Sequence, residues 1–181
     1  MSINKKKIYI FTVLLSLMFI LVCMKQLFKN DIRKIALLNN EIRAFKEVDL
    51  ENGKYKIVLP EKWSVNERNK NIDGVEFEAT VNDNNKIDGT ISILDGVNDL
   101  NNIPDTIFKD VKNRKYKVYD DYGVNWHVLE YKMPYDNKYK NICYFREYSK
   151  GKILIISFHF DESQYKPSIK VAFDEVAKGF R

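Results

Sequence analysis

Three residues with side chains suited to metal binding or nucleophilic catalysis occur in the second half of the chain: His127, Cys143 and His159. Each lies in a run with the alternating pattern of a β-strand, so a shared site would have to form across strands. Their spacing fits no zinc pattern, and no acidic residues cluster near them in the sequence. Cys143 stands in mid-strand, away from the helix N-termini that activate thiols. We therefore expect both histidines to be hydrogen-bonded within the fold or exposed to solvent, and Cys143 to be a free thiol in the core. We expect no metal site and no catalysis.

A second run with chemical potential, residues 84–95 (NNKIDGTISILD), imitates a calcium-binding loop. Asp88 and Gly89 fall at positions five and six of such a loop, but Lys86 occupies position three and the short Asp95 occupies position twelve. A lysine cannot ligate a cation. The sequence instead predicts a β-hairpin turn at Asp88-Gly89.

The usual glycine-rich and catalytic motifs are missing from the sequence. It contains no Walker loop, no Gly-x-Ser-x-Gly, no His-Glu-x-x-His, and only seven glycines in all. Phosphate-binding loops are rich in glycine, so we expect no nucleotide chemistry, no cofactor and no enzyme activity.

Tyrosine is abundant, with 11 Tyr beside 11 Phe. Tyr131, Tyr135 and Tyr139 gather around the run MPYDNKY, and tyrosine is enriched in protein interfaces because it buries area while keeping a polar tip. We interpret these three as a surface that binds a partner protein. The alternative is that they are ordinary residues of a sheet.

The elements that must position these residues begin with an apolar segment. Residues 8–24 form 17 uncharged positions after three lysines, which as a helix span roughly 25 Å, the short end of a transmembrane helix. Cys23 is preceded by the bulky Val22, whereas lipid attachment needs a small residue there, and no small-x-small cleavage site follows. We expect a retained membrane anchor with Cys23 inside it.

Charge places the rest of the chain relative to that anchor. Residues 1–49 hold nine Lys and Arg against four Asp and Glu, and residues 50–181 hold 21 of each, so the net charge of +5 belongs to the anchor region. A folded domain without excess positive charge does not predict nucleic-acid binding. Residues 1–7 are expected to form a cytoplasmic tail, which places the C-terminal domain outside the cytoplasm of a single-pass protein.

Residues 25–52 follow the anchor and are expected to form a juxtamembrane helical stalk. Phe28, Ile32, Ile35, Asn39 and Ile42 recur at spacings of 4, 3, 4 and 3, the seam of a coiled coil with one polar position. Only about two heptads exist, fewer than a sustained coil shows. The stripe either packs on the domain or the membrane surface, or it joins two copies into a homodimer through Ile32, Ile35, Asn39 and Ile42.

Residues 53–181 are long enough for one domain with its own core. Alternation predicts strands at residues 55–59, 74–81, 90–94, 116–121, 124–131, 141–149 and 152–160, and 3.6-residue periodicity predicts helices at 103–115 and after Pro167. The run KILIISFHF (152–160) is apolar on both faces, which is typical of a central strand covered on both sides. We expect an α+β fold, a mostly antiparallel sheet flanked by helices.

The run YKIVLPEKWSV, in which a strand leads through Leu-Pro to Trp63, resembles the opening of PsbP-like domains. The order of hairpins, middle helix, long strands and closing helix over 53–181 is also similar to that family, which includes many bacterial envelope proteins. The resemblance implies an antiparallel sheet between helices and a binding or assembly role, and it carries over no functional residue.

Together these features predict a single-pass, membrane-anchored, extracytoplasmic binding or assembly module with an envelope protein as its partner. The alternative is a pilin-like or secretion-machinery subunit, since a long N-terminal helix that runs into an antiparallel domain is also typical of that class. The segment lacks the Gly-Phe-Thr-Leu-x-Glu processing signature, because Phe11 follows Ile10.

Overall fold

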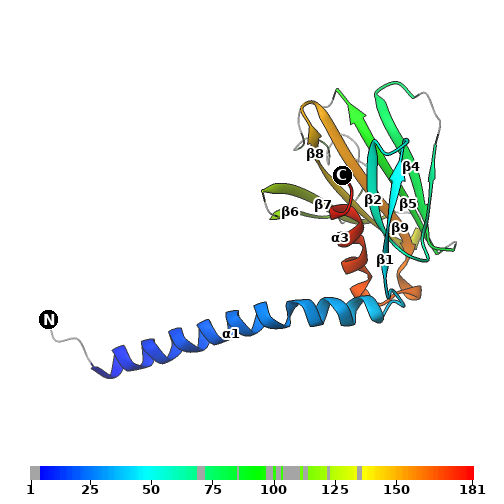
Figure 1. Ribbon diagram of the computed structural model, residues 1–181. Coiled ribbons are helices and arrows are strands. Elements are labelled where there is room, and N and C mark those ends of the chain that lie inside the picture. The colour runs from blue at the N-terminus through cyan, green and yellow to red at the C-terminus, as the bar shows by residue number, and fades with distance from the viewer. Residues whose placement is uncertain are drawn as a thin grey trace.

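A long N-terminal helix precedes an antiparallel β domain that ends in a short helix (Figure 1). The computed structural model describes residues 5–68, 72–84, 86–96, 100, 103, 111, 114–121, 123–133 and 136–181. The helical elements are α1 (Lys5–Leu38), the 3-10 helices η2 (Glu162–Gln164) and η3 (Pro167–Ile169), and α3 (Lys170–Lys178). The strands are β1 (Phe45–Leu50), β2 (Tyr55–Pro60), β3 (Ser64–Glu67), β4 (Val75–Asn82), β5 (Ile87–Asp95), β6 (Lys115–Asp121), β7 (Val124–Met133), β8 (Asp136–Ser149) and β9 (Lys152–Asp161).

Seven of the strands form one antiparallel sheet in the order β3-β4-β5-β9-β8-β7-β6. β9 occupies the middle of this sheet, which confirms the prediction for residues 152–160. Its alternate residues serve two cores: Leu154, Ile156 and Phe158 face one, and Ile153 and Ile155 face the other. The expected α+β class is confirmed for the domain.

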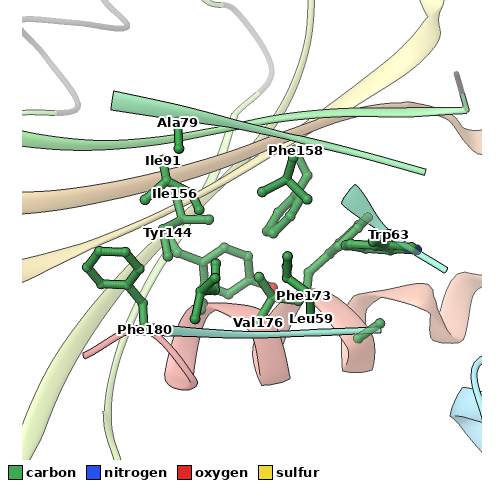
Figure 2. Close-up of a cluster of buried hydrophobic side chains, with 14 of the residues drawn as sticks. Leu59, Trp63, Ala79, Ile91, Tyr144, Ile156, Phe158, Phe173, Val176 and Phe180 are labelled. Atoms are coloured by element: carbon green, nitrogen blue, oxygen red, sulfur yellow. The ribbon is translucent and has the colours of Figure 1, made fainter. Parts of the chain in front are cut away.

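The main core lies between the sheet and a layer made of α3 and the β1–β2 hairpin (Figure 2). The ring of Phe173 from α3 stacks on Phe158 of β9, with centroids 4.2 Å apart and an interplanar angle of 13°. Trp63, just before β3, is only 2 % exposed and packs against both phenylalanines. Leu59 of β2 adds to the same layer, so residues from both ends of the domain close over the central strand.

A smaller cluster covers the opposite face of the sheet. Leu129, Cys143, Phe145 and Ile153 are buried there together with Ile103. Of the helix predicted at 103–115, almost all lies outside the described residues. Ile103 itself is 3 % exposed and is buried in the cluster on the sheet face opposite α3.

The predicted helical stalk over residues 25–52 is wrong beyond Leu38, where α1 ends. The amide of Glu41 donates to Leu38 O (3.0 Å) and that of Ile42 donates to Leu37 O (3.0 Å), while Glu41 adopts a left-handed φ of 61°. This is the hydrogen-bond pattern of a Schellman cap, and Leu37 packs against the core cluster that contains Ile42. Glycine usually occupies the left-handed position, and its absence explains why the sequence shows no helix end here.

The predicted domain boundary at residue 53 falls inside a hairpin. β1 pairs antiparallel with β2 from Phe45–Pro60 to Leu50–Tyr55, and Gly53 (φ 88°) belongs to the turn between them. Leu50 is 3 % exposed and Ile42 is 7 % exposed, so both belong to the domain core. The folded unit therefore begins near the end of α1.

The predicted turn at Asp88-Gly89 is also misplaced. The chain reverses between Asp83 and Ile87, where the amide of Lys86 donates to Asp83 O (2.9 Å), and both residues of the pair lie inside β5. A Cβ on Gly89 would lie 3.2 Å from Val81 Cβ and 3.2 Å from Ser157 O. The glycine here permits close packing of strands instead of a turn, and residues 87–95 form a strand instead of a calcium loop.

In the described part of the chain, no helix taken singly has both the length and the apolar composition needed to cross a bilayer. Ile8–Met24 and Leu27–Leu38 reach that length and composition together, with a bend of 41° between them.

Candidate functional site

A groove of about 1010 Å³ lies at the end of the domain where α1 joins it. Four separate segments form its walls: the cap of α1, the step between β2 and β3, the turn between β4 and β5, and the chain that follows β9. The lining residues are 38–44, 60–63, 83–84, 86 and 163–166. The groove is therefore built by the tertiary fold from segments that are far apart in sequence.

Asn40 holds the α1 wall of the groove in place. Its Nδ2 donates to Ala36 O (2.9 Å) and contacts Ser168 Oγ (3.0 Å), and its Oδ1 accepts from the Lys166 amide (3.1 Å). One side chain thus joins the helix end to the segment before η3. Arg33, two turns earlier on α1, pairs with Glu175 of α3. The last turns of α1 are consequently fixed to the domain.

Tyr165 joins the opposite walls. Its hydroxyl donates to Asp83 Oδ2 (2.8 Å), which ties the β4–β5 turn to the segment after β9, and its ring packs edge-on against Phe160. Burial and the neighbouring carboxylate raise the pKa of Tyr165, so the phenol stays protonated as the donor. Trp63 lies beneath, and its amide donates to Pro60 O (2.9 Å) at the step between the strands.

Both signs of charge line the groove. The charged lining residues are Glu41, Arg43, Glu61, Lys62, Asp83, Lys86 and Lys166. Three of these residues are acidic and four are basic, so the groove has no strongly positive electrostatic potential that would attract a polyanion. No histidine or cysteine is present among its described lining residues. Apolar lining dominates small-molecule pockets, so this polar lining of mixed charge does not suit an apolar small molecule.

The three residues considered for metal or nucleophile chemistry share one sheet face but engage other partners. His127 is buried, shares a hydrogen bond with the Tyr116 hydroxyl and stacks on Phe145 (5.1 Å). Burial lowers the pKa of His127, so it is neutral at physiological pH. The strand register sets it opposite Phe145, two residues from Cys143 along β8.

The strand register also separates His159 from Cys143. His159 stands opposite Asn141 on β8, with its Nδ1 2.9 Å from Asn141 Oδ1 and its ring stacked on Tyr139 (4.6 Å). Burial raises the pKa of the Cys143 thiol to about 12. Among the described residues, no three His, Cys, Asp or Glu side chains are grouped closely enough to hold a metal ion. A protonated, enclosed thiol away from either histidine is unsuited to nucleophilic attack.

The predicted tyrosine surface is divided. Tyr139 is half-buried against His159, and Tyr131, on the next strand, is half-buried beside the Cys143 cluster, where burial raises its pKa to about 12. Tyr135 lies outside the described residues. Tyr131 and Tyr139 do share the sheet face opposite α3, but whether they meet a partner stays a prediction.

The residues of the predicted stalk seam also take different places. Ile32 and Ile35 are exposed on α1, Asn39 lies in the turn that follows, and Ile42 is buried in the domain core. The seam as predicted is therefore not continuous, because the helix ends before its last two positions. The groove next to it was missed, since Asn40, Asp83 and Tyr165 come from three distant segments that share no spacing pattern.

No protein-family model and no curated protein matches the chain. Solved structures share its fold. The solution structure of cyanobacterial PsbP (CyanoP) from Synechocystis sp. PCC 6803 is 15 % identical, covers 76 % of this chain and 92 % of its own, and superposes with a TM-score of 0.54. The crystal structure of the Saccharomyces cerevisiae Ran-binding protein Mog1p is 10 % identical, covers 76 % and 95 %, and also gives 0.54. The expected PsbP-like fold is thereby confirmed.

Proposed function

We propose that this protein is a non-catalytic protein-binding module, tethered to a membrane by residues 8–24, that captures an envelope protein in the groove at the end of α1. The observation that carries the proposal is the groove itself: about 1010 Å³, lined by both signs of charge and placed where the domain meets its helix. The domain stands outside the cytoplasm in this proposal.

The fold is compatible with a binding role. One of the solved structures that share this fold is a Ran-binding protein, which binds another protein. In the present chain the groove is formed mainly by the turns and connections at one end of the sheet. Loops on a rigid scaffold are the common location of binding residues.

The chemistry of the described residues favours binding over catalysis. His127 and His159 each engage a local partner, and Cys143 is a protonated thiol enclosed by the sheet. A general base has to reach a substrate proton from within hydrogen-bond distance, and a nucleophile needs an adjacent base. Neither requirement is met in the groove or on the sheet face by these three residues.

A tether makes a modest groove effective. Confinement to the same membrane as its partner raises the effective concentration and substitutes for affinity that a polar groove of mixed charge lacks in solution. Removal of residues 1–24 is therefore expected to abolish capture while leaving the domain folded.

Site-specific photocrosslinking tests the proposal. A photoreactive amino acid at Lys62, in the groove, should give a discrete adduct with one protein in intact membranes, whereas the same group at Lys117, exposed on β6 far from the groove, should not. The adduct should disappear when Glu61 and Lys86 are replaced by residues of opposite charge, and when residues 1–24 are deleted. Equal adducts from Lys62 and Lys117, or an adduct that survives the charge reversals, would contradict the groove as the binding site.

The topology is tested separately. Protease added to intact protoplasts should remove the domain and leave a fragment containing residues 8–24. Protection of the domain until lysis would place it in the cytoplasm, where an envelope partner is inaccessible.

A further inference from the structure

A stripe of large apolar side chains on α1, defined by Leu27, Phe28, Ile32, Ile35 and Leu38, is exposed to solvent. Each of the five is 49–75 % exposed. At 3.6 residues per turn they occupy one side of the helix over its last three turns. Contiguous exposed apolar surface of this kind marks an interaction site for protein or membrane.

The other side of the same turns is attached to the domain. Ala36 is 7 % exposed, Leu37 packs against the main core, and Arg33 pairs with Glu175 on α3. These contacts fix the rotation of the helix about its axis, so the apolar stripe points away from the domain. The domain cannot cover the stripe itself while these contacts hold.

Charge and chain continuity indicate what covers it. The stripe begins three residues after the apolar run Ile8–Met24, and the two helical segments are bent by 41° relative to each other. Lys29 neighbours Ile32 on one border of the stripe, and Lys34 neighbours Leu38 on the other, at spacings of three and four residues. An apolar face bordered by lysines is typical of helices that lie in the interface of an anionic bilayer.

The same borders disfavour a second copy of the chain as the occupant. Two stripes packed against each other would bring the lysines of both helices together, and like charges along such a seam repel. Asp31, on the same side as Leu27 and Ile35, remains hydrated only at headgroup depth. It is compatible with a helix that rests at the interface and not with one immersed in hydrocarbon.

We propose that residues 27–38 form an interfacial helix whose stripe binds the surface of an anionic lipid bilayer and thereby fixes the orientation of the domain on the membrane. The inference rests on the proposed anchoring by residues 8–24. Because the groove starts at Leu38, its α1 wall then lies next to the lipid headgroups, and the groove faces partners that are themselves at the membrane surface.

Fluorescence quenching by lipid tests this inference with the full chain in vesicles of phosphatidylcholine and phosphatidylglycerol. The phosphatidylcholine acyl chains carry bromine close to the headgroup, where it quenches tryptophan on contact. Ile32→Trp and Ile35→Trp place the probe in the stripe, and Asn30→Trp places it on another side of the same exposed turn. Trp63 and Trp126, both buried in the domain, give the constant background and report that each variant is folded.

We expect brominated lipid to remove most of the added fluorescence of Ile32→Trp and Ile35→Trp and little of that of Asn30→Trp. Replacing phosphatidylglycerol by neutral lipid, or Lys29 and Lys34 by Gln, should reduce the quenching.

If the chain stays in the vesicle fraction but all three probes are quenched by aqueous iodide and not by bromine, the stripe is in water and the inference fails while anchoring stands. If both stripe probes resist iodide and bromine alike and the chain crosslinks to itself, a second copy covers the stripe. If the chain does not stay with the vesicles, the anchoring fails and the inference with it.

Discussion

Gly179, at the end of α3, lies so close to Val58 of β2 that a Cβ on the glycine would be 2.6 Å from Val58 Cβ. The same Cβ would lie 3.0 Å from the Glu175 carbonyl oxygen, which is part of the helix backbone and cannot rotate away. The contact lets the chain pass over β2, where Arg181 exchanges backbone hydrogen bonds with Lys56 (2.7 and 3.0 Å). Gly179 is thus required for close approach and not for a turn, since its φ is −78°.

Replacing Gly179 by Ala should therefore lower the free energy of unfolding by about 1–3 kcal/mol, the usual cost of overpacking a filled contact. Urea denaturation followed by tryptophan fluorescence measures the change. Val58→Gly in the same chain removes the Cβ that the new methyl group would meet, and it should recover part of the loss. If the losses of the two single variants simply add in the double variant, the overlap between residues 179 and 58 is not the cause of the destabilisation.

Glu41 carries the left-handed conformation that ends α1, with φ 61°. A non-glycine residue there costs roughly 1–2 kcal/mol, so Glu41→Gly should raise the free energy of unfolding by about 1 kcal/mol. The neighbouring change Asn40→Gly should have the opposite sign, because it removes the side-chain hydrogen bonds to Ala36, Ser168 and Lys166. If Glu41→Gly is less stable than the parent, the Glu41 side chain itself stabilises the folded state by more than the strain of its backbone costs.

Cys143 should resist alkylation in the folded protein. Its side chain is 1 % exposed and burial raises its pKa to about 12, so at pH 8 both access and thiolate are lacking. Treatment of the protein with iodoacetamide at pH 8, followed by mass spectrometry of peptides, should find Cys143 unmodified until denaturant is added. Rapid modification without denaturant would reveal a reactive thiol and reopen the question of catalysis.

Asp174 should make stability depend on pH in the direction opposite to most carboxylates. It lies on α3 beneath the sheet and accepts a hydrogen bond from the Tyr144 hydroxyl (2.6 Å), and burial raises its pKa above the ordinary 3.8. The folded state therefore holds this proton more tightly, and the stability it contributes is complete below the unfolded pKa and lost as the pH rises through the folded pKa.

Asp174→Asn keeps an acceptor for Tyr144 and removes the buried charge. The variant should melt at a higher temperature than the parent at pH 7, and the difference should vanish as the pH falls below 3.8. Thermal unfolding by circular dichroism across this range measures it. A variant less stable than the parent at neutral pH would show that Lys170 and Lys178 compensate the carboxylate fully.

The domain boundary gives a further prediction. Residues 53–181 alone lack β1 and with it the burial of Leu50 and Ile42, which corresponds to a loss of about 3–6 kcal/mol. That loss is comparable to the total stability of many domains. Residues 36–181 retain both side chains and the Asn40 contacts, and we expect them to unfold cooperatively, whereas residues 53–181 should be molten by near-UV circular dichroism. Equal cooperativity of the two fragments would return the boundary to residue 53.

The strands show which features of the fold can be predicted from the sequence alone. The nearly continuous apolar run within 152–160 is enough to predict a central strand, because a strand covered on both sides carries apolar residues on both of its faces. The apolar run at 8–24, the division of charge between residues 1–49 and 50–181, and the closing helix after Pro167 are equally local properties and can be read without a structure. Composition and pattern thus determine the class of the fold.

The tertiary structure decides what pattern leaves open. Residues 45–50 carry apolar side chains at Phe45, Val48 and Leu50, a spacing that suits a helix or a strand, and pairing with β2 selects the strand. Glu41 ends α1 in a left-handed conformation without the usual glycine, and the packing of Leu37 and Ile42 into the main core compensates the strained backbone. The groove belongs to the same class: its walls come from four distant segments, and only the folded chain brings Asn40, Asp83 and Tyr165 to one place.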